Sequence, residues 1–222
     1  MTDALEKVAA RYEAWLASRK VAPNRPITGL ESAYHLPLDS KGLAARNWQD
    51  VPTDWVPPAA EIHAGGYGED RAIYDTPIFN PPGEEPRTIH LGLDVFAPAG
   101  TPVFAPLGGV VHSLQRNENA KDYGPTLILE HAPEPGLTVW TLYGHLAADV
   151  LATFEPGAPV SAGARIAALG SSDVNGGWAP HLHFQVMLDL EGRTGDFPGV
   201  ARKSEAAHWL KLCPDPMAFL GL

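Results

Sequence analysis

The chain has 222 residues, which is long enough to bury a sizeable core and fits one domain with additions. Its formal net charge of -10 argues against proteins that bind nucleic acid or anionic membranes through clusters of Lys and Arg. Cys213 is the only cysteine, so an internal disulfide is excluded. The 22 glycines and 22 prolines indicate many turns and favour a mainly β fold.

The first third of the chain divides into a helix and an irregular stretch. Apolar residues recur at helical spacing over residues 3–19, which predicts an amphipathic helix docked on the main body. Residues 21–88 hold many prolines and little sustained periodicity. We therefore predict an irregular lead-in there, with short strands near 59–64 and 71–79.

From residue 89 short apolar runs alternate with turn residues at roughly ten-residue spacing, which is typical of a β-sandwich or barrel. The predicted strands are residues 90–95, 102–105, 108–115, 125–131, 137–145, 165–169 and 181–189. Residues 203–212 return to a helical pattern before Pro214, and a short tail follows. We expect three parts. The N-terminal helix and the lead-in occupy 1–86, a small antiparallel β-sandwich or barrel-like core occupies 87–190, and a helix and tail at 191–222 pack on that core.

Three fragments rich in histidine carry the chemistry. They are His90-Leu91-Gly92-Leu93-Asp94, Tyr143-Gly144-His145-Leu146 and His181-Leu182-His183-Phe184. On an extended strand, residues two or four apart point to the same face, so each of two strands could aim two polar side chains into one cleft. Two imidazoles and one carboxylate form a ligand set that zinc accepts, with a fourth position open for water.

These fragments lie in a longer ordered pattern that resembles the lysostaphin and LytM group of zinc metallopeptidases. The similar stretches are Ile89-His90-Leu91-Gly92-Leu93-Asp94, Ala97-Pro98-Ala99-Gly100-Thr101-Pro102-Val103, Gly108-Gly109-Val110-Val111, Tyr123-Gly124, Leu129-Glu130-His131, Thr141-Leu142-Tyr143-Gly144-His145-Leu146, Val160-Ser161-Ala162-Gly163 and Pro180-His181-Leu182-His183-Phe184. The resemblance covers residues 87–186. It implies a small antiparallel β fold with the active site in a groove.

The resemblance also implies roles for five residues. His90, Asp94 and His183 would hold one Zn²⁺ ion, while His145 and His181 would stay uncoordinated beside the bound water as the catalytic pair. Which of the two acts as base and which steadies the oxyanion is left open by the sequence. The reaction implied is hydrolysis of an amide in the peptide part of peptidoglycan, with a peptide or muropeptide as substrate.

Other residues have structural interpretations. We expect hydrogen-bonded structural roles for His35, His63, His112 and His208, and a structural or peripheral role for His131. Tyr143 is expected to pack rather than react. Trp178 fits a substrate wall or plain packing. Gly92 and Gly144 fit either close approach of another group or ordinary turns and bulges.

The flanks leave alternatives open. The N-terminus shows no secretory signal, so the sequence as given predicts a cytoplasmic protein, or a periplasmic or extracellular one if a signal was trimmed. We expect no membrane insertion and no nucleic acid, and the sequence carries no signal for oligomeric state.

A weaker similarity concerns residues 175–185 and 212–216. They resemble the peptidase-like segment of kinase and aminotransferase fusion proteins, which would make a small cytosolic amide the substrate. A regulatory or binding module of metallopeptidase shape is a further alternative. A last alternative is that residues 21–88 lie across the groove and hold the enzyme latent, with Asn80 and several acidic residues reaching the metal.

Overall fold

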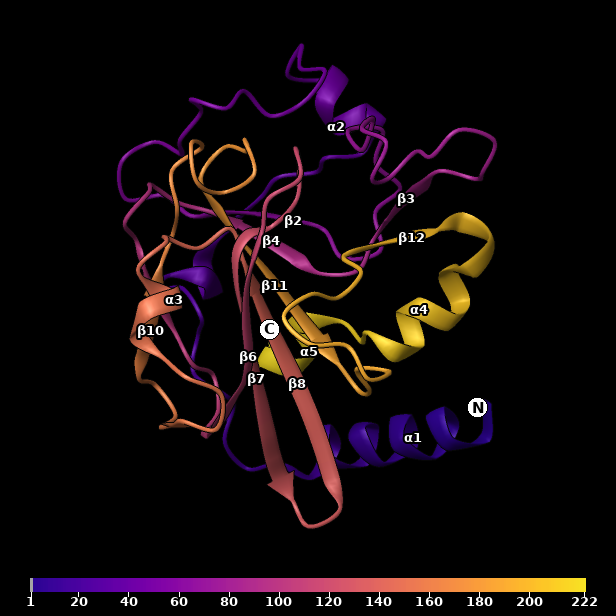
Figure 1. Ribbon diagram of the computed structural model, residues 1–222, viewed down its shortest axis with the longest axis vertical. Coiled ribbons are helices and arrows are strands. Elements are labelled where there is room, and N and C mark those ends of the chain that lie inside the picture. Colours follow the sequence, from indigo (N-terminus) through magenta and orange to yellow (C-terminus); the bar gives the residue numbers. More distant parts are fainter. Residues whose placement is uncertain (1) are drawn as a thin grey trace.

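One large mixed sheet organises the chain (Figure 1). The computed structural model describes residues 2–222. The strand order is β1 (Tyr34–His35), β2 (His63–Gly65), β4 (Leu93–Phe96), β11 (His181–Met187), β8 (Leu137–Gly144), β7 (Gly124–Glu134), β6 (Gly109–Asn117) and β9 (Pro159–Val160). Strands β1 and β2 are parallel, and every other pair is antiparallel. The predicted mainly β fold is confirmed, although the lead-in adds β1 and β2 to one edge of the sheet.

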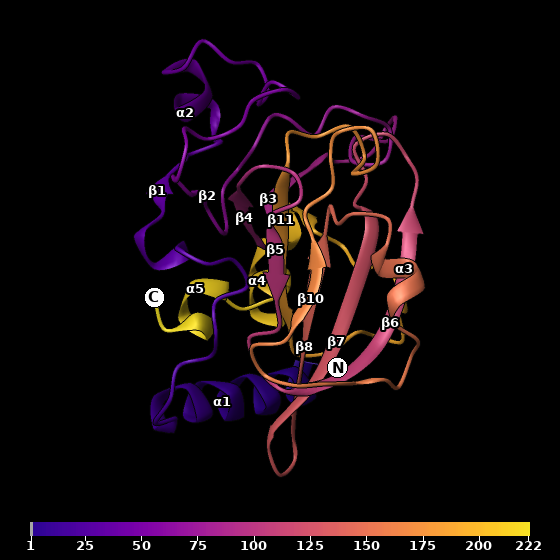
Figure 2. The ribbon, with the colours of Figure 1, turned by 90° about the vertical axis from the view of Figure 1, so that its left-hand side faces the viewer.

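Two short strand pairs accompany this sheet. Strands β5 (Pro102–Phe104) and β10 (Arg165–Ala168) form one pair, and β3 (Arg87–His90) and β12 (Val200–Arg202) form the other. The pair β5–β10 lies in front of the large sheet in Figure 2, and Val103 and Ile166 share its core with Leu127, Val139 and Phe184. The two layers therefore pack face to face, as in a sandwich. Burial of each of these side chains contributes roughly 1.5–3 kcal/mol.

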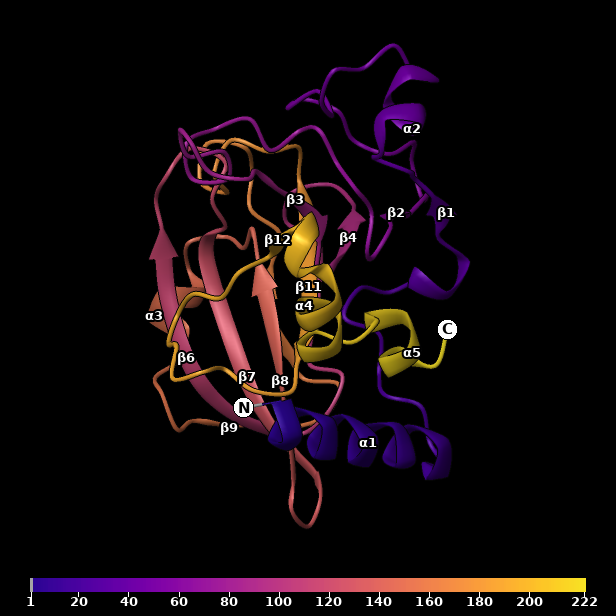
Figure 3. The ribbon, with the colours of Figure 1, turned by 90° about the vertical axis from the view of Figure 1, so that its right-hand side faces the viewer.

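Helices gather on one side of the sheet, as Figure 3 shows for α1 (Thr2–Ser18), α4 (Ala206–Leu212) and α5 (Pro216–Leu220). Trp15 of α1 packs on Phe219 of α5 with ring centroids 6.0 Å apart, so the predicted N-terminal helix is a docked packing element. The predicted helix at 203–212 begins with the 3₁₀ turn η2 (Lys203–Glu205). The remaining helical segments are short: η1 (Leu30–Ser32), α2 (Ser40–Ala44) and α3 (Val150–Thr153). Across residues 2–222, no helix combines the length and apolar character that a membrane crossing requires.

The prediction of one continuous strand at 90–95 is wrong. Strand β3 ends at His90 and β4 begins at Leu93, and the two strands belong to different sheets. The backbone N–H of Leu91 donates to Gly199 O at 2.9 Å, which keeps this part of the chain against β12 before it crosses to the large sheet. His90 and Asp94 therefore do not share one strand face. They approach each other from two sheets instead.

The predicted strand at 71–79 is also wrong. The N–H of Arg71 donates to Thr88 O, but the chain then turns, and the N–H groups of Phe79 and Asn80 both donate to Thr76 O at 2.9 Å. Near 59–64 only His63 and Ala64 enter a strand, β2. The apolar residues at 71–79 pack over the functional site rather than forming a ladder.

Candidate active site

Three potential metal ligands converge where the two sheets meet. Asp94 on β4 lies directly opposite His183 on β11, a register that brings cross-strand side chains together. His90 enters from the end of β3. His90 Nε2 is 3.1 Å from His183 Nδ1 and 3.3 Å from Asp94 Oδ1, and His183 Nδ1 is 3.1 Å from Asp94 Oδ1. The structure thus brings together the three residues that the resemblance implies, all of them buried.

Hydrogen bonds on the far side of each ring determine where the histidine protons sit. His90 Nδ1–H donates to Gly66 O at 3.0 Å, because a carbonyl oxygen can only accept. Gln185 Nε2 donates to Pro198 O, so Gln185 Oε1 faces His183 and accepts from His183 Nε2–H at 2.9 Å. In the neutral form of each ring, His90 Nε2 and His183 Nδ1 are then the nitrogens without a proton, and both are directed at one point.

The burial of these groups favours the same state. Burial, reinforced by the charge of Arg71, lowers the pKa of His90 to about 4, so the ring is neutral. Burial opposes ionisation of Asp94, but the charged guanidinium of Arg71 beside it favours the anion, and the pKa of that carboxyl lies well below its usual range. Two nitrogen lone pairs and an anionic oxygen at about 3 Å repel one another unless a cation lies between them. The donor set therefore fits a metal ion.

Arg71 anchors the carboxylate from behind. Its Nη1 donates to Asp94 Oδ2 at 2.6 Å and its Nε donates to Glu69 Oε2 at 2.8 Å, while the guanidinium is fully buried. With Oδ2 occupied in this way, Oδ1 is the oxygen left to face the two histidines. The lead-in thus makes two hydrogen bonds that position the candidate ligands: Arg71 bonds to Asp94, and the carbonyl of Gly66 accepts from His90.

His145 and His181 stand beside the ligand cluster, with ring centroids 4.2 Å apart. His145 Nδ1–H donates to Asn175 O at 2.8 Å, and His181 Nδ1–H donates to Ala179 O at 2.7 Å. His181 Nε2 lies 3.8 Å from Asp94 Oδ1. Burial lowers the pKa of both rings, so each is neutral and has an Nε2 lone pair that can accept a proton. His145 adopts φ 62°, a left-handed conformation that non-glycine residues rarely use outside constrained sites.

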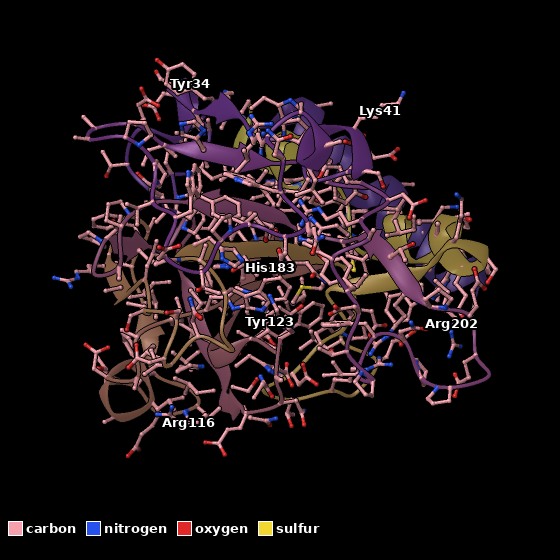
Figure 4. All side chains as sticks on the ribbon, turned by 90° about the horizontal axis from the view of Figure 1, so that it is seen from above. Tyr34, Lys41, Arg116, Tyr123, His183 and Arg202 are labelled. Atoms are coloured by element: carbon pink, nitrogen blue, oxygen red, sulfur yellow. The ribbon has the colours of Figure 1, made fainter. Side chains whose placement is uncertain are left out.

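A cavity of about 200 Å³ opens onto these five residues. Figure 4 shows His183 and Tyr123 next to each other near the middle of the molecule, with Tyr34 and Lys41 of the lead-in on one side and Arg116 on the other. Trp178 forms part of the cavity wall and is also packed in a hydrophobic cluster, so both of its expected roles apply. Asn80 is absent from the cavity lining and from the ligand cluster within residues 2–222, so the expected contact with the metal site is not made.

The remaining histidines and Tyr143 lie outside the cavity. His131 is buried, with Nδ1 bonded to Gly108 O and Nε2 to Thr141 Oγ1, which is a structural role. Tyr143 is buried and its hydroxyl accepts from Thr141 Oγ1 at 2.9 Å, so it packs as expected. None of the four histidines expected to be structural lines the cavity: His35, His63, His112 and His208.

Sequence reasoning missed several residues that support the site. Gln185 follows His183 by two positions on β11, so the alternation of strand faces could have identified it. Arg71 and Gly66 gave no such signal, because they lie in an irregular segment. The backbone acceptors at Asn175 and Ala179 carry no side-chain signature at all.

Gly92 and Gly144 are close-approach glycines rather than ordinary turns. A Cβ at Gly92 would lie 2.6 Å from His183 Cε1 and Nε2 and 2.9 Å from Phe184 O, and one at Gly144 would lie 2.6 Å from the ring of Tyr123.

We expect Gly92→Ala to lower metal affinity by about 10- to 100-fold, because the His183 ring must shift. Competition with a chromogenic chelator measures this. Gly108→Ala, whose Cβ would meet only ordinary contacts at 3.6 Å, is the control, and equal affinities of the two variants would contradict the prediction.

Residues 88–194, which contain all five site residues, match the model of peptidase family M23. Over this segment the chain is similar to M23 peptidases. It is similar to an uncharacterized metalloprotease of Haemophilus influenzae, with 33% identity over 115 residues covering 50% of this chain and 22% of that protein. The chain thus spans less than a quarter of that relative's length.

Two solved structures are also similar in sequence to the M23 domain. A zinc-containing peptidase from Vibrio cholerae is 31% identical, covering 45% of this chain and 27% of that chain, with a TM-score of 0.37. The catalytic domain of the antimicrobial peptidase lysostaphin from Staphylococcus simulans is 28% identical, covering 61% of this chain and 81% of that chain, with a TM-score of 0.40.

Proposed function

We propose that the protein is a zinc-dependent peptidase that hydrolyses peptide bonds of peptidoglycan or of muropeptides. The observation that carries this proposal is the convergence of two imidazole lone pairs and one carboxylate oxygen beside two neutral, uncoordinated histidines. Two nitrogens and one oxygen form a donor set used in catalytic zinc sites, which keep one position open. His90, Asp94 and His183 would hold the ion.

When bound, zinc lowers the pKa of water from 15.7 towards about 7 and polarises the scissile carbonyl. His145 and His181 then divide the proton transfers. Each ring is fixed by an Nδ1–H bond to a backbone carbonyl, so its Nε2 can take a proton from water and later deliver it to the leaving amine. The second ring, once protonated, can donate to the developing oxyanion.

The substrate class rests on similarity. Lysostaphin is described as an antimicrobial peptidase, and the Vibrio cholerae protein as a zinc-containing peptidase. For this chain a peptide substrate agrees with the M23 assignment, and peptidoglycan or muropeptides are the proposed source of that peptide. A small cytosolic amide is the second candidate, which the limited volume of the cavity favours.

Removal and return of the metal tests this proposal. Treatment with a chelator is expected to abolish release of new amino groups from peptidoglycan or stem peptides, and one equivalent of zinc per chain is expected to restore it. Zinc should also raise the free energy of unfolding, by about 2.7 kcal/mol at a free concentration 100 times its Kd. The peptidase assignment fails if the zinc-loaded protein cleaves neither peptidoglycan, stem peptides nor Gly-rich peptides.

A further inference from the structure

The lead-in forms a roof over the catalytic cavity. Leu38, Val51, Ile73 and Tyr74 line the cavity and belong to one hydrophobic cluster with Trp178. Tyr74 and Trp178 meet edge to face with ring centroids 6.2 Å apart. The apolar side chains of the roof therefore pack against the walls of the cavity as in a hydrophobic core, and their burial stabilises this arrangement.

An ion pair fastens this roof to the opposite wall. Asp50 of the lead-in accepts from Lys121 Nζ at 2.5 Å, and both residues line the cavity. Lys121 Nζ also lies 3.9 Å from the centroid of the Trp178 ring, and the backbone N–H of Lys121 donates to Gly176 O. Contact between Asp50 and Lys121 joins the lead-in to the loop between β6 and β7 at one side of the cavity.

The volume of the cavity suits a small ligand. At about 200 Å³ the cavity is smaller than the roughly 300–1,000 Å³ typical of sites for drug-sized molecules. A short peptide segment fits such a volume, whereas a long cross-linked strand would need a groove open at both ends.

Arg87 supplies a charge that such a peptide could use. It lines the cavity, donates through Nη2 to Ile78 O, and stacks over Phe79 with its guanidinium carbon 5.4 Å from the ring centroid. Among residues 2–222 no carboxylate lies within 4.0 Å of its nitrogens, although Asp196 lines the same cavity. A guanidinium that is fixed in position and has no carboxylate partner within the protein can bind the carboxylate of a ligand.

The spacing along β3 relates this charge to the reacting bond. Arg87 precedes His90 by three residues on the strand, so their Cα atoms are about 10 Å apart at 3.3 Å per residue. An odd spacing places side chains on opposite faces of a regular strand, but β3 pairs with β12 irregularly and both side chains line the cavity. An extended peptide covers that distance with two or three residues. A carboxylate held at Arg87 would therefore end a peptide whose scissile bond lies only a few residues upstream.

We propose that this site acts on short peptides with a free C-terminal carboxylate, which sit beneath the lead-in with that carboxylate on Arg87. The proposal rests on the peptidase function proposed above and narrows its substrate to the ends of small peptides. Internal bonds of an intact polymer would be poorer substrates, because a chain that continues past the site has no free carboxylate to place on Arg87 and would have to pass the Asp50–Lys121 contact.

Binding by calorimetry tests the proposal independently of turnover. The probes are peptidoglycan stem tripeptide and pentapeptide, their C-terminal carboxamides, and the same peptides extended at the C-terminus by six glycines and then amidated, each with the zinc-loaded protein. We expect the free acids to bind about 10- to 100-fold more tightly than the carboxamides, as loss of a charged hydrogen bond implies. The extended peptides should bind at least as weakly as the carboxamides.

Two variants make the test specific. Arg87→Gln should remove the difference between acid and carboxamide, while Arg116→Gln, an exposed arginine paired with Glu118, should keep it. Equal binding of acid, carboxamide and extended peptide by the unmodified protein would overturn the proposal, whether or not Arg87→Gln folds. Cleavage of the probes is measured in a separate assay. If the protein binds the free acids more tightly than the carboxamides but cleaves no probe, the peptidase function is contradicted, while recognition of short peptides with a free carboxylate still holds.

Discussion

Replacing His181 or His145 with alanine is expected to lower kcat by about 100- to 10,000-fold, the usual contribution of a positioned general acid or base. Each ring is buried and neutral, and each is fixed by a hydrogen bond from Nδ1 to a backbone carbonyl. Neither belongs to the ligand cluster of His90, Asp94 and His183, so one equivalent of zinc should remain bound. The expected result is thus an enzyme that is loaded with metal but nearly inactive.

Zinc content, circular dichroism and initial rates must be measured on the same preparations. His208→Ala is the matched control, because its side chain is 42% exposed on α4 and lies outside the cavity. His181→Gln adds a variant of similar volume, which separates loss of the imidazole from loss of packing against Phe96. If both alanine variants kept kcat within about threefold of the unmodified enzyme, the acid–base roles would have to be assigned elsewhere.

The sequence predicted the part of the site that depends on strand alternation and on motif spacing. His181 and His183 alternate with Leu182 and Phe184, and the structure places the histidines at the site and the apolar residues in the main core. Such a pattern can be read locally, because a strand with one polar and one apolar face has a period of two. The ordered fragments around it identified the other two candidate ligands, His90 and Asp94, without knowledge of the tertiary fold.

The same local reasoning failed between His90 and Asp94. Four-residue spacing indicated one strand, but the chain changes sheets at Leu91 and Gly92. That crossing depends on a backbone bond to Gly199, which lies more than 100 residues downstream in the sequence, and on the His183 ring that occupies the space above Gly92. Contacts of this kind are set by tertiary packing and leave no periodicity in the sequence.

The lead-in was the least predictable part of the chain. Its prolines indicated an irregular segment, and Asn80 with several acidic residues suggested that this segment covers the groove. In the structure it forms a roof whose residues also support the candidate ligands from behind. A buried arginine in a loop has no sequence signature, because loop arginines are usually solvated. Arg71 therefore gives the sharpest test of whether this segment is integral to the site.

Arg71→Met is expected to lower the free energy of unfolding of the metal-free protein by about 3–5 kcal/mol, the cost of leaving a buried charge without its partner. Asp94 and Glu69 would both lose the guanidinium that now bonds to them at 2.6 and 2.8 Å. Zinc affinity should also fall by about 10- to 100-fold, because Asp94 would no longer be fixed with Oδ1 towards His90 and His183. Urea denaturation with and without zinc, together with chelator competition, measures both quantities.

Arg116→Met provides the comparison, since Arg116 pairs with Glu118 on the surface, where an ion pair contributes about 0–1 kcal/mol. Arg71→Lys refines it: lysine keeps the charge but cannot bond to two carboxylates in the planar geometry of arginine, so zinc affinity should still fall. A removable inhibitory segment would behave in the opposite way, because weakening its contact with the site would leave metal binding intact and raise activity. Loss of zinc affinity in Arg71→Met, with none in Arg116→Met, would show that the lead-in is a working part of the metal site.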